Sequence, residues 1–276
     1  MSRLLKNLNP WCYLEHGSLY RKDDFIIFEN KNSVNQIPMD SFAMILIGPG
    51  VSISSNCLSH MGKYNGIVVI SSSSAVPKML FSASPSSGNF KLTEKQANLY
   101  STQKKRLDIA QQFCEMRFPQ EKERIKITRS FKELLGVEGS IVKKVYKEVF
   151  GKEFIRNYES NDSINKLINI GNNALYSYAY TVCLHLGLSP HLGFYHRTRK
   201  NGLLFDLGDC LKTKEYYDLI QNYSSLSINE SLKKLSNIIY GEKNRQLIKG
   251  VLNVFGENKD EKSFLDSFGE WVIFDP

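Results

Sequence analysis

Hydrophobic residues in the first third of the chain fall in short runs bounded by turn residues. Three runs rich in Ile, Val and Phe begin at Asp24, Phe42 and Gly66, and Gly, Asn, Ser or Pro flank them. This pattern is typical of β-strands. Between the last two runs the sequence predicts one short helix, with Ser54 or Ser55 as its N-cap. The first third is therefore predicted to be β-rich.

A segment rich in Ser, Pro and Gly follows at residues 71–90. Its one apolar piece, Met79–Phe81, is predicted to be a last strand, and the rest is predicted to be a linker. The change of composition at this point marks a domain boundary.

From about residue 93 the apolar residues recur at intervals of three and four, which predicts helices. The first predicted helix covers Thr93–Phe118, with Thr93 as a candidate N-cap and a basic cluster on its other face. Ser130 and Glu133 have the spacing of a capping box. A long helix is predicted over Ile164–Leu186, and Gly187 is its stop signal.

The predicted fold class is α+β, with a small N-terminal β-rich, sandwich-like domain and a larger C-terminal all-α domain. We place the β domain at residues 1–83, the linker at 84–92 and the helical domain at 93–276. No apolar run approaches the ~18 residues of a membrane span, and the start resembles no secretory signal. We expect a cytoplasmic protein with no membrane partner. Five cysteines without a CxxC pair argue against a disulfide framework and a zinc finger.

The chain is basic, with a formal net charge of +8 from 36 Lys and Arg against 28 Asp and Glu. A basic balance suits a polyanionic partner such as DNA. Solvated helix faces explain clustered charge equally well, so composition leaves both interpretations open. The clusters lie at residues 104–106, 124–129, 143–144 and 197–200.

Candidate catalytic side chains are concentrated around residues 193–212. Asp206 and Asp209 are three residues apart, which places both carboxylates on one face of a helix. Asp206 stands among leucines, and a buried carboxylate needs a partner. A divalent cation is one partner; Arg197 or Arg199 would be another, and His196 is either a ligand or a hydrogen-bonded core residue.

Glu138 precedes a predicted helix that carries Val142, Val145 and Val149. An acid in the first turn of a helix is also stabilised by the helix dipole, so its position alone does not assign a role.

Together these residues resemble a known family, the CRISPR-associated spacer-acquisition integrases, which are the universal CRISPR adaptation nucleases. The resemblance runs from Leu14 to about Lys212 and is strongest to the version found in subtype E of type I systems. That family has a Glu in an xEG turn, a His in a GFxH turn and two Asp in a DxxD helix. The segments that carry the resemblance are Gly136–Gly139, Asn173–Tyr176, Gly193–His196 and Asp206–Asp209.

The resemblance implies an N-terminal β domain that dimerises and a helical domain that holds one metal ion. It implies that Glu138, His196 and Asp209 bind Mg²⁺ or Mn²⁺. Asp206 would be a supporting acid, and Tyr176 matches a family tyrosine near the same site, so all five are candidate catalytic residues. Carboxylates suit hard ions, and the single imidazole shifts the preference towards Mn²⁺.

The implied function is a metal-dependent DNA endonuclease and integrase that inserts prespacer DNA into a CRISPR array. In this transesterification a DNA 3′-hydroxyl attacks a phosphodiester of the repeat. The implied partners are double-stranded DNA from prespacer and CRISPR repeat, a second copy of the chain and a small companion protein. His16 stands where related proteins have a tyrosine that brackets the duplex end. The candidate DNA-binding residues are His16, Lys104, Lys105, Arg106, Arg197, Arg199 and Lys200.

Two other functions remain open from sequence: a DNA-binding scaffold of the adaptation complex without catalysis, and an unrelated metal-dependent nuclease. The runs Phe25–Phe28 and Phe42–Ile47 are more apolar than a one-layer β domain needs, which predicts burial between two subunits. The apolar segment Trp271–Phe274 near the C-terminus either docks on its own domain or adds a strand to the companion protein.

Overall fold

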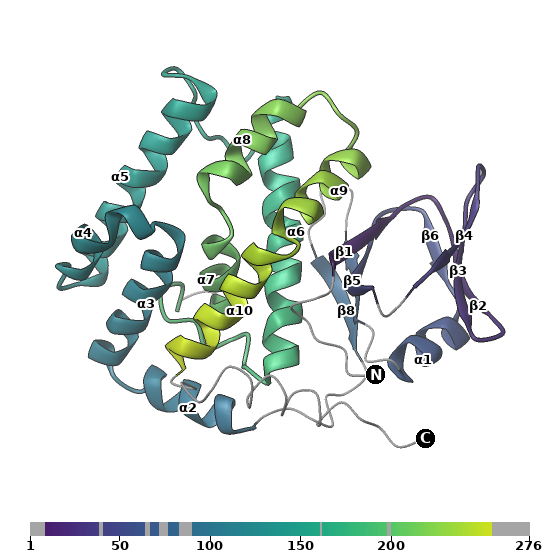
Figure 1. Cartoon of the computed structure of the whole chain (residues 1–276), viewed down its shortest axis with the longest axis horizontal. Coiled ribbons are helices and arrows are strands. Elements are labelled where there is room, and N and C mark those ends of the chain that lie inside the picture. Colours follow the sequence, from purple (N-terminus) through teal and green to yellow (C-terminus); the bar gives the residue numbers. More distant parts are fainter. Residues whose placement is uncertain are drawn as a thin grey trace.

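The computed structural model describes residues 9–38, 41–63, 67–71, 77–82, 90–160, 162–197 and 200–255. A β-rich part precedes a helical part, which confirms the predicted fold class (Figure 1). Residues 84–89 of the predicted linker and the apolar segment Trp271–Phe274 lie outside the described residues, and residues 90–92 of that linker begin helix α2.

The β-rich part has two four-stranded sheets among the described residues, with the orders β1-β5-β7-β8 and β4-β3-β2-β6. The runs at Asp24, Phe42, Gly66 and Met79 are confirmed as strands β3, β5, β7 and β8, and the predicted helix is α1. The other strands carry weaker patterns and were not predicted. The elements are β1 (Asn9–Leu14), β2 (Gly17–Lys22), β3 (Phe25–Glu29), β4 (Val34–Ile37), β5 (Phe42–Ile47), β6 (Val51–Ile53), α1 (Ser55–Lys63), β7 (Ile67–Ser71) and β8 (Pro77–Ser82).

Strand β5 is apolar throughout because it is buried on both faces. Met44 and Leu46 belong to the main core shared with the helices, whereas Ile45 and Ile47 face the core between the two sheets. A strand covered on both sides needs no polar alternation. Two sheets agree with the predicted sandwich-like domain, and packing within one chain accounts for the apolarity of Phe42–Ile47 without a second subunit. The homodimer stays a prediction.

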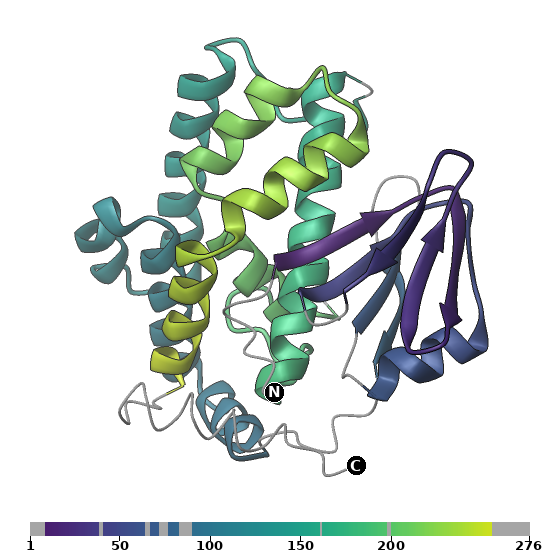
Figure 2. The same ribbon diagram turned by 45° about the vertical axis from the view of Figure 1, so that its right-hand side comes forward.

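Strand β1 joins the β-rich part to the helices. The indole Nε1 of Trp11 donates to the carbonyl of Leu232 at 3.2 Å, and Ser236 Oγ donates to the Trp11 carbonyl at 3.3 Å. The indole also packs edge-on against Tyr178, with ring centroids 6.2 Å apart. Figure 2 shows β1 reaching the helical part beside α9.

The helices form a bundle around the long α6, which Figure 1 places at its centre next to the sheets. The predicted long helix is confirmed as α6, and no described helix is long and apolar enough to span a membrane. The helices are α2 (Phe90–Tyr100), α3 (Gln103–Arg117), α4 (Lys122–Lys126), α5 (Phe131–Phe150), α6 (Ser163–Leu186), α7 (Gly202–Cys210), α8 (Lys214–Tyr223), α9 (Ile228–Ile239) and α10 (Glu242–Val254).

Two helix predictions need correction. The segment Thr93–Phe118 is two helices, because Thr102 interrupts the first and caps α3 by accepting from the Lys105 N–H. Arg106 Nη1 donates to the Tyr100 carbonyl at 2.6 Å and stabilises this break. Glu138 does not precede a helix but lies inside α5, which begins after Ser130.

Candidate active site

The carboxylate of Asp206 organises one half of the site. It accepts from the backbone N–H groups of Phe194 (2.6 Å), Tyr195 (3.2 Å) and His196 (3.1 Å). The sequence leaves open a divalent cation or an arginine as the partner of this buried acid, and the structure supplies backbone N–H donors. Such bonds fix the loop that carries His196 against α7.

The same loop needs glycine where it crosses the start of α7. A Cβ on Gly193 would lie 2.3 Å from the backbone carbon of Gly202, which no side chain can tolerate. Gly193 is therefore required for the close backbone approach that brings the amides of the loop onto Asp206.

The imidazole of His196 is oriented by Asp206. Its Nδ1 lies 2.9 Å from Asp206 Oδ1, so an ionised Asp206 assigns the ring proton to Nδ1. The lone pair is then on Nε2, which points towards Asp209, with 3.9 Å between Nε2 and Asp209 Oδ2. A neutral imidazole held in this way is a typical metal ligand.

Asp209 is held on its other oxygen. Its Oδ1 accepts from Tyr176 Oη at 3.1 Å and pairs with Lys212 Nζ at 2.6 Å. Burial alone would raise the pKa of Asp209, but Lys212 and Arg117 outweigh it and hold that pKa at about 2. The carboxylate is thus ionised at any working pH. A Cβ on Gly208 would lie 2.5 Å from the Tyr176 ring, so this glycine makes room for the tyrosine.

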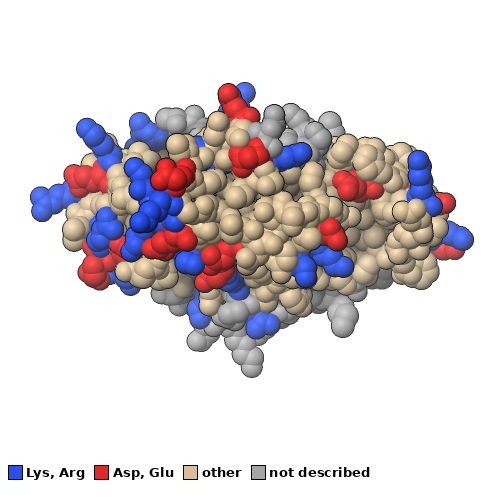
Figure 3. Space-filling view, turned by 90° about the horizontal axis from the view of Figure 1, so that it is seen from above, with Lys and Arg blue, Asp and Glu red and all other residues tan. Residues whose placement is uncertain are grey.

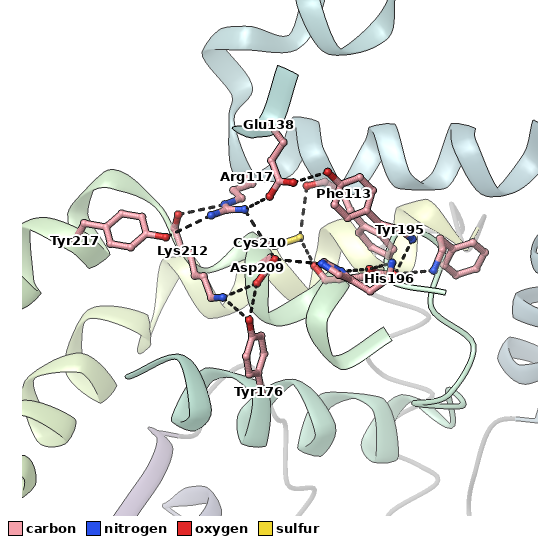
Figure 4. Close-up of polar contacts among 12 residues, drawn as sticks. Phe113, Arg117, Glu138, Tyr176, Tyr195, His196, Asp209, Cys210, Lys212 and Tyr217 are labelled. Atoms are coloured by element: carbon pink, nitrogen blue, oxygen red, sulfur yellow. Dashed lines mark hydrogen bonds and ion pairs between the residues drawn. The ribbon is translucent and has the colours of Figure 1, made fainter. Parts of the chain in front are cut away.

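Glu138 lies on α5. It is linked to the rest of the site by Arg117, the last residue of α3, which contacts both Glu138 and Asp209. Arg117 Nη1 lies 2.6 Å from Glu138 Oε1 and 3.9 Å from Asp209 Oδ2. The second oxygen of Glu138 accepts a hydrogen bond from Tyr195 Oη. Figure 4 shows the guanidinium of Arg117 between Glu138 and Asp209.

These groups line one small pocket. The structure brings four predicted site residues together here: Glu138, His196, Asp206 and Asp209. Tyr176 reaches the site through its bond to Asp209. The lining residues are Ala110, Phe113, Cys114, Arg117, Glu138, Tyr195, His196, Asp206, Asp209 and Cys210.

The donors of Glu138, His196 and Asp209 are chemically suited to a hard divalent ion, and they come from three separate segments onto one pocket. No three His, Cys, Asp or Glu side chains among the described residues lie close enough to share one ion as they stand. In this structure Glu138 Oε1 pairs with Arg117 Nη1 at 2.6 Å instead.

The predicted DNA-binding residues that the structure describes do not line this pocket. His16 is exposed in the turn between β1 and β2, and Arg197 and Lys200 are exposed near the His196 loop. Lys105 Nζ donates to Asn98 Oδ1 at 2.5 Å, and Arg106 is engaged with Tyr100, so both have structural partners. Lys104 is exposed, and Arg199 lies outside the described residues.

Basic and acidic side chains are mixed on the upper surface of the molecule. In Figure 3 they gather at the end formed by α4 and α5 in Figure 1, with Asp and Glu among the Lys and Arg. Arg124, for example, pairs with Glu121 at 2.7 Å, and Lys144 with Glu148 at 4.0 Å. This face alone therefore offers no continuous basic stripe.

Sequence analysis missed three residues that hold the site: Arg117, Tyr195 and Lys212. Lys212 had a signal, since it continues the three-residue spacing of Asp206 and Asp209. Arg117 had none, because its side chain is 6% exposed and its partners come from distant segments. Although burial alone would lower the pKa of Arg117, Tyr217, Asp209 and Glu138 raise it, so the guanidinium is always charged.

Curated relatives are similar over most of the chain. A CRISPR-associated endonuclease Cas1 from Clostridium sp. (strain SY8519) is 23% identical over 280 residues, covering 95% of this chain and 91% of the relative. The CRISPR-associated endonuclease Cas1 2 of Chlorobaculum tepidum is 29% identical over 229 residues, covering 78% and 75%.

Solved structures share the fold. A CAS1 protein from Thermotoga maritima has a TM-score of 0.71 at 20% identity, covering 91% of this chain and 98% of its own. A TtCas1–DNA complex has a TM-score of 0.59 at 20% identity, covering 93% and 99%. A casposase bound to integration product has a TM-score of 0.72 at 16% identity, covering 96% of each chain.

The family model for the CRISPR associated protein Cas1 matches residues 12–123 and 116–220. These two matches cover most of the chain and include all the pocket residues described above. The chain belongs to the Cas1 family of CRISPR-associated proteins.

Proposed function

We propose that this chain is a divalent-metal-dependent DNA endonuclease and integrase that inserts prespacer DNA into a CRISPR array. The reaction is a transesterification in which a DNA 3′-hydroxyl attacks a phosphodiester of the repeat. The observation that carries this proposal is the convergence of Glu138, His196 and Asp209 on one pocket in a chain of the Cas1 family.

Glu138, His196 and Asp209 would hold Mg²⁺ or Mn²⁺. When bound, such an ion polarises a phosphoryl group and stabilises negative charge on the oxygens of the reacting phosphate. The protein's own part is orientation. Asp206 fixes the His196 ring and its tautomer, and Tyr176 and Lys212 fix one oxygen of Asp209.

Two cations beside Asp209, Arg117 in the pocket wall and Lys212 behind it, complete the proposed chemistry. Lys212 Nζ and the Arg117 guanidinium are both nearly buried beside Asp209. Fixed positive charge in a water-poor pocket stabilises the charge that builds on phosphate oxygens during the displacement. No covalent enzyme intermediate is needed, because the DNA hydroxyl is itself the nucleophile.

The proposed partners follow from the relatives. One solved Cas1 is a DNA complex, a casposase neighbour is bound to integration product, and the curated relatives are called endonucleases. We propose double-stranded DNA as substrate, contacted by His16, Lys104, Lys105, Arg197, Arg199 and Lys200. A homodimer, a small companion protein and assignment to subtype E belong to the same proposal.

A strand-joining assay tests the function. Purified protein is incubated with a labelled DNA duplex with free 3′-ends and a plasmid that carries a CRISPR repeat, in Mn²⁺ or in EDTA. We expect joined product only with Mn²⁺, and none from Asp209→Ala or His196→Ala, which should still bind DNA. Asp218→Ala is the matched control, because this acid is exposed on α8 and pairs only with Lys214 in the contacts observed. DNA binding without joining by the wild-type protein would contradict the proposal.

A further inference from the structure

Arg117 is an internal cation that contacts the carboxylates of two candidate metal ligands. Its Nη1 lies 2.6 Å from Glu138 Oε1 and 3.9 Å from Asp209 Oδ2. Charge-assisted bonds of this length are strong, and both partners are largely buried, at 6% and 17% side-chain exposure for Arg117 and Glu138. The guanidinium therefore engages the same oxygens that a metal ion would require.

The guanidinium is anchored on its other nitrogens. Nε donates to the Lys212 carbonyl at 3.3 Å, and Nη2 to Tyr217 Oη at 3.4 Å. The carbon of the guanidinium also lies 4.6 Å from the centre of the Phe118 ring. These longer contacts hold Arg117 in the pocket, whereas its shortest bond is to Glu138.

The other contacts of Glu138 and Asp209 show which of their carboxylate oxygens are left for an ion. Asp209 Oδ1 is taken by Lys212 and Tyr176, and Glu138 Oε2 by Tyr195. The two oxygens that face each other across the pocket are Glu138 Oε1 and Asp209 Oδ2, and Arg117 Nη1 contacts both. A divalent ion bound to Glu138 Oε1 would occupy the place of Arg117 Nη1 and would be repelled by the guanidinium charge.

We propose that Arg117 competes with the divalent ion for Glu138, so that the site loads its ion only when the Arg117–Glu138 ion pair opens. This inference rests on the proposed function, since it takes Glu138 and Asp209 to be metal ligands. The apparent affinity of the site for the ion is therefore lowered by the free energy needed to break the Arg117–Glu138 pair.

Metal binding to the full-length protein tests the competition without any measurement of activity. The free Mn²⁺ signal in electron paramagnetic resonance gives the dissociation constant for wild type and for Arg117→Met, which keeps an unbranched apolar stem and removes the charged guanidinium. We expect Arg117→Met to bind Mn²⁺ at least ~10-fold more tightly, because a unit charge next to the ion is removed. Equal or weaker Mn²⁺ binding by Arg117→Met overturns the proposal. Weaker binding would mean that Arg117 positions Glu138 for the ion.

Two control variants separate a failure of this proposal from a failure of the proposed metal site. Arg124→Met removes an arginine that pairs with a glutamate at a similar distance, 2.7 Å from Glu121, but in an exposed position, and it should leave Mn²⁺ affinity unchanged. Glu138→Gln should abolish Mn²⁺ binding; if it binds Mn²⁺ like the wild type, the proposed metal site is wrong, whatever Arg117 does.

The wild-type protein gives a second test if Arg117→Met does not fold. Arg117 Nε–H is buried and bonded to the Lys212 carbonyl, so it should give a slowly exchanging signal in ¹⁵N-arginine NMR spectra. We expect this signal, assigned by its loss in Arg117→Lys, to shift when Mg²⁺ is added. A signal that stays unchanged at saturating Mg²⁺ overturns the proposal.

Discussion

The pocket has two halves that are held in different ways. The α7 half consists of the His196 loop and α7, where one buried carboxylate, Asp206, accepts three peptide N–H bonds and orients the histidine. The α5 half consists of Glu138 and Arg117, which meet through one short ion pair between α3 and α5. One half is fixed by several hydrogen bonds within a short segment, and the other by one contact between distant segments.

The comparison shows that the α7 half is held rigidly, whereas the α5 half depends on one ion pair that can open. The hydrogen bonds to Asp206 hold the His196 loop rigidly, because any rearrangement would leave several backbone N–H groups without an acceptor. The Arg117–Glu138 pair can open at the cost of one interaction, and the charges on both sides remain able to find other partners. We therefore expect substitution of Asp206 to affect folding, and substitution of Arg117 or Glu138 to affect mainly ion binding.

The largest effect is expected from Asp206→Ala. It leaves three peptide N–H groups and the His196 Nδ1–H without their acceptor, and each buried unsatisfied donor costs about 1–3 kcal/mol. Chemical denaturation should show the free energy of unfolding reduced by at least ~3 kcal/mol. Asp218→Ala should change it by less than ~1 kcal/mol, as expected for an exposed pair. A loss below ~1 kcal/mol in Asp206→Ala would mean that the loop is not held by this acid.

A smaller loss is expected where α2 clamps the start of the same loop. Gln96 is fully buried; its Nε2 donates to the carbonyls of Ser189 (2.8 Å) and Leu192 (3.0 Å), and its Oε1 accepts from the Ser189 N–H at 2.7 Å. Gln96→Met should cost about 1–3 kcal/mol of stability and Gln96→Glu more, because its carboxyl would face two carbonyls.

Amide hydrogen exchange separates this clamp from a general loss of stability. In Gln96→Met the backbone amide hydrogen of Ser189 should exchange faster than the loss of global stability alone would predict. Gln111→Met is the matched control in the other half, since Gln111 Nε2 donates to the carbonyls of Ile125 (3.1 Å) and Thr128 (2.9 Å). Equal acceleration at Ser189 in both variants would show that α2 does not hold the loop.

Tyr195→Phe probes the link between the halves, because Tyr195 Oη donates to Glu138 while its backbone N–H binds Asp206. Burial and the charge of Glu138 raise the pKa of Tyr195, so the hydroxyl keeps its proton at physiological pH. Loss of one hydrogen bond should cost about 0.5–1.5 kcal/mol in denaturation, with strand joining reduced less than ~10-fold. A larger loss of joining would mean that Glu138 depends on Tyr195 more than on Arg117.

The smallest effect on stability is expected from Lys104→Ala with Lys105→Ala, less than ~0.5 kcal/mol. Their proposed role is phosphate contact, so the slope of log Kd for duplex DNA against log salt should fall by up to ~2. Arg106 is kept in this design because it stabilises the α2–α3 break through Tyr100. An unchanged slope would place the DNA path elsewhere.

Part of the α7 half could be predicted from sequence because that information is local, whereas the peptide N–H donors to Asp206 were not predicted. Asp206 and Asp209 are spaced for one helix face, and Gly193 permits the close turn that brings the loop amides to Asp206. The order of a β-rich part before a helical part also followed from the switch between short β-rich runs and helical spacing. In the second sheet only β3 was predicted, because β2, β4 and β6 are partly exposed and carry no strong apolar run.

The α5 half could not be predicted because it depends on packing between distant segments. Glu138 was expected before a helix, yet the helix begins at Phe131, since Ser130 accepts from the Glu133 N–H and caps it. Nothing in the spacing of Arg117 marks it as the partner of Glu138, which is 21 residues away. A buried ion pair of this kind leaves no periodic signal in the sequence.

The central claim is that the two halves act as one strand-joining centre, and a double-substitution cycle tests it most directly. Initial rates of Mn²⁺-dependent joining are measured for wild type, Glu138→Gln, Asp209→Asn and the double variant. The account predicts that each single substitution lowers the rate at least ~100-fold and that the double variant is no more than about threefold slower than the worse single one, because groups that act as a unit are not additive. Losses that multiply in the double variant would contradict it.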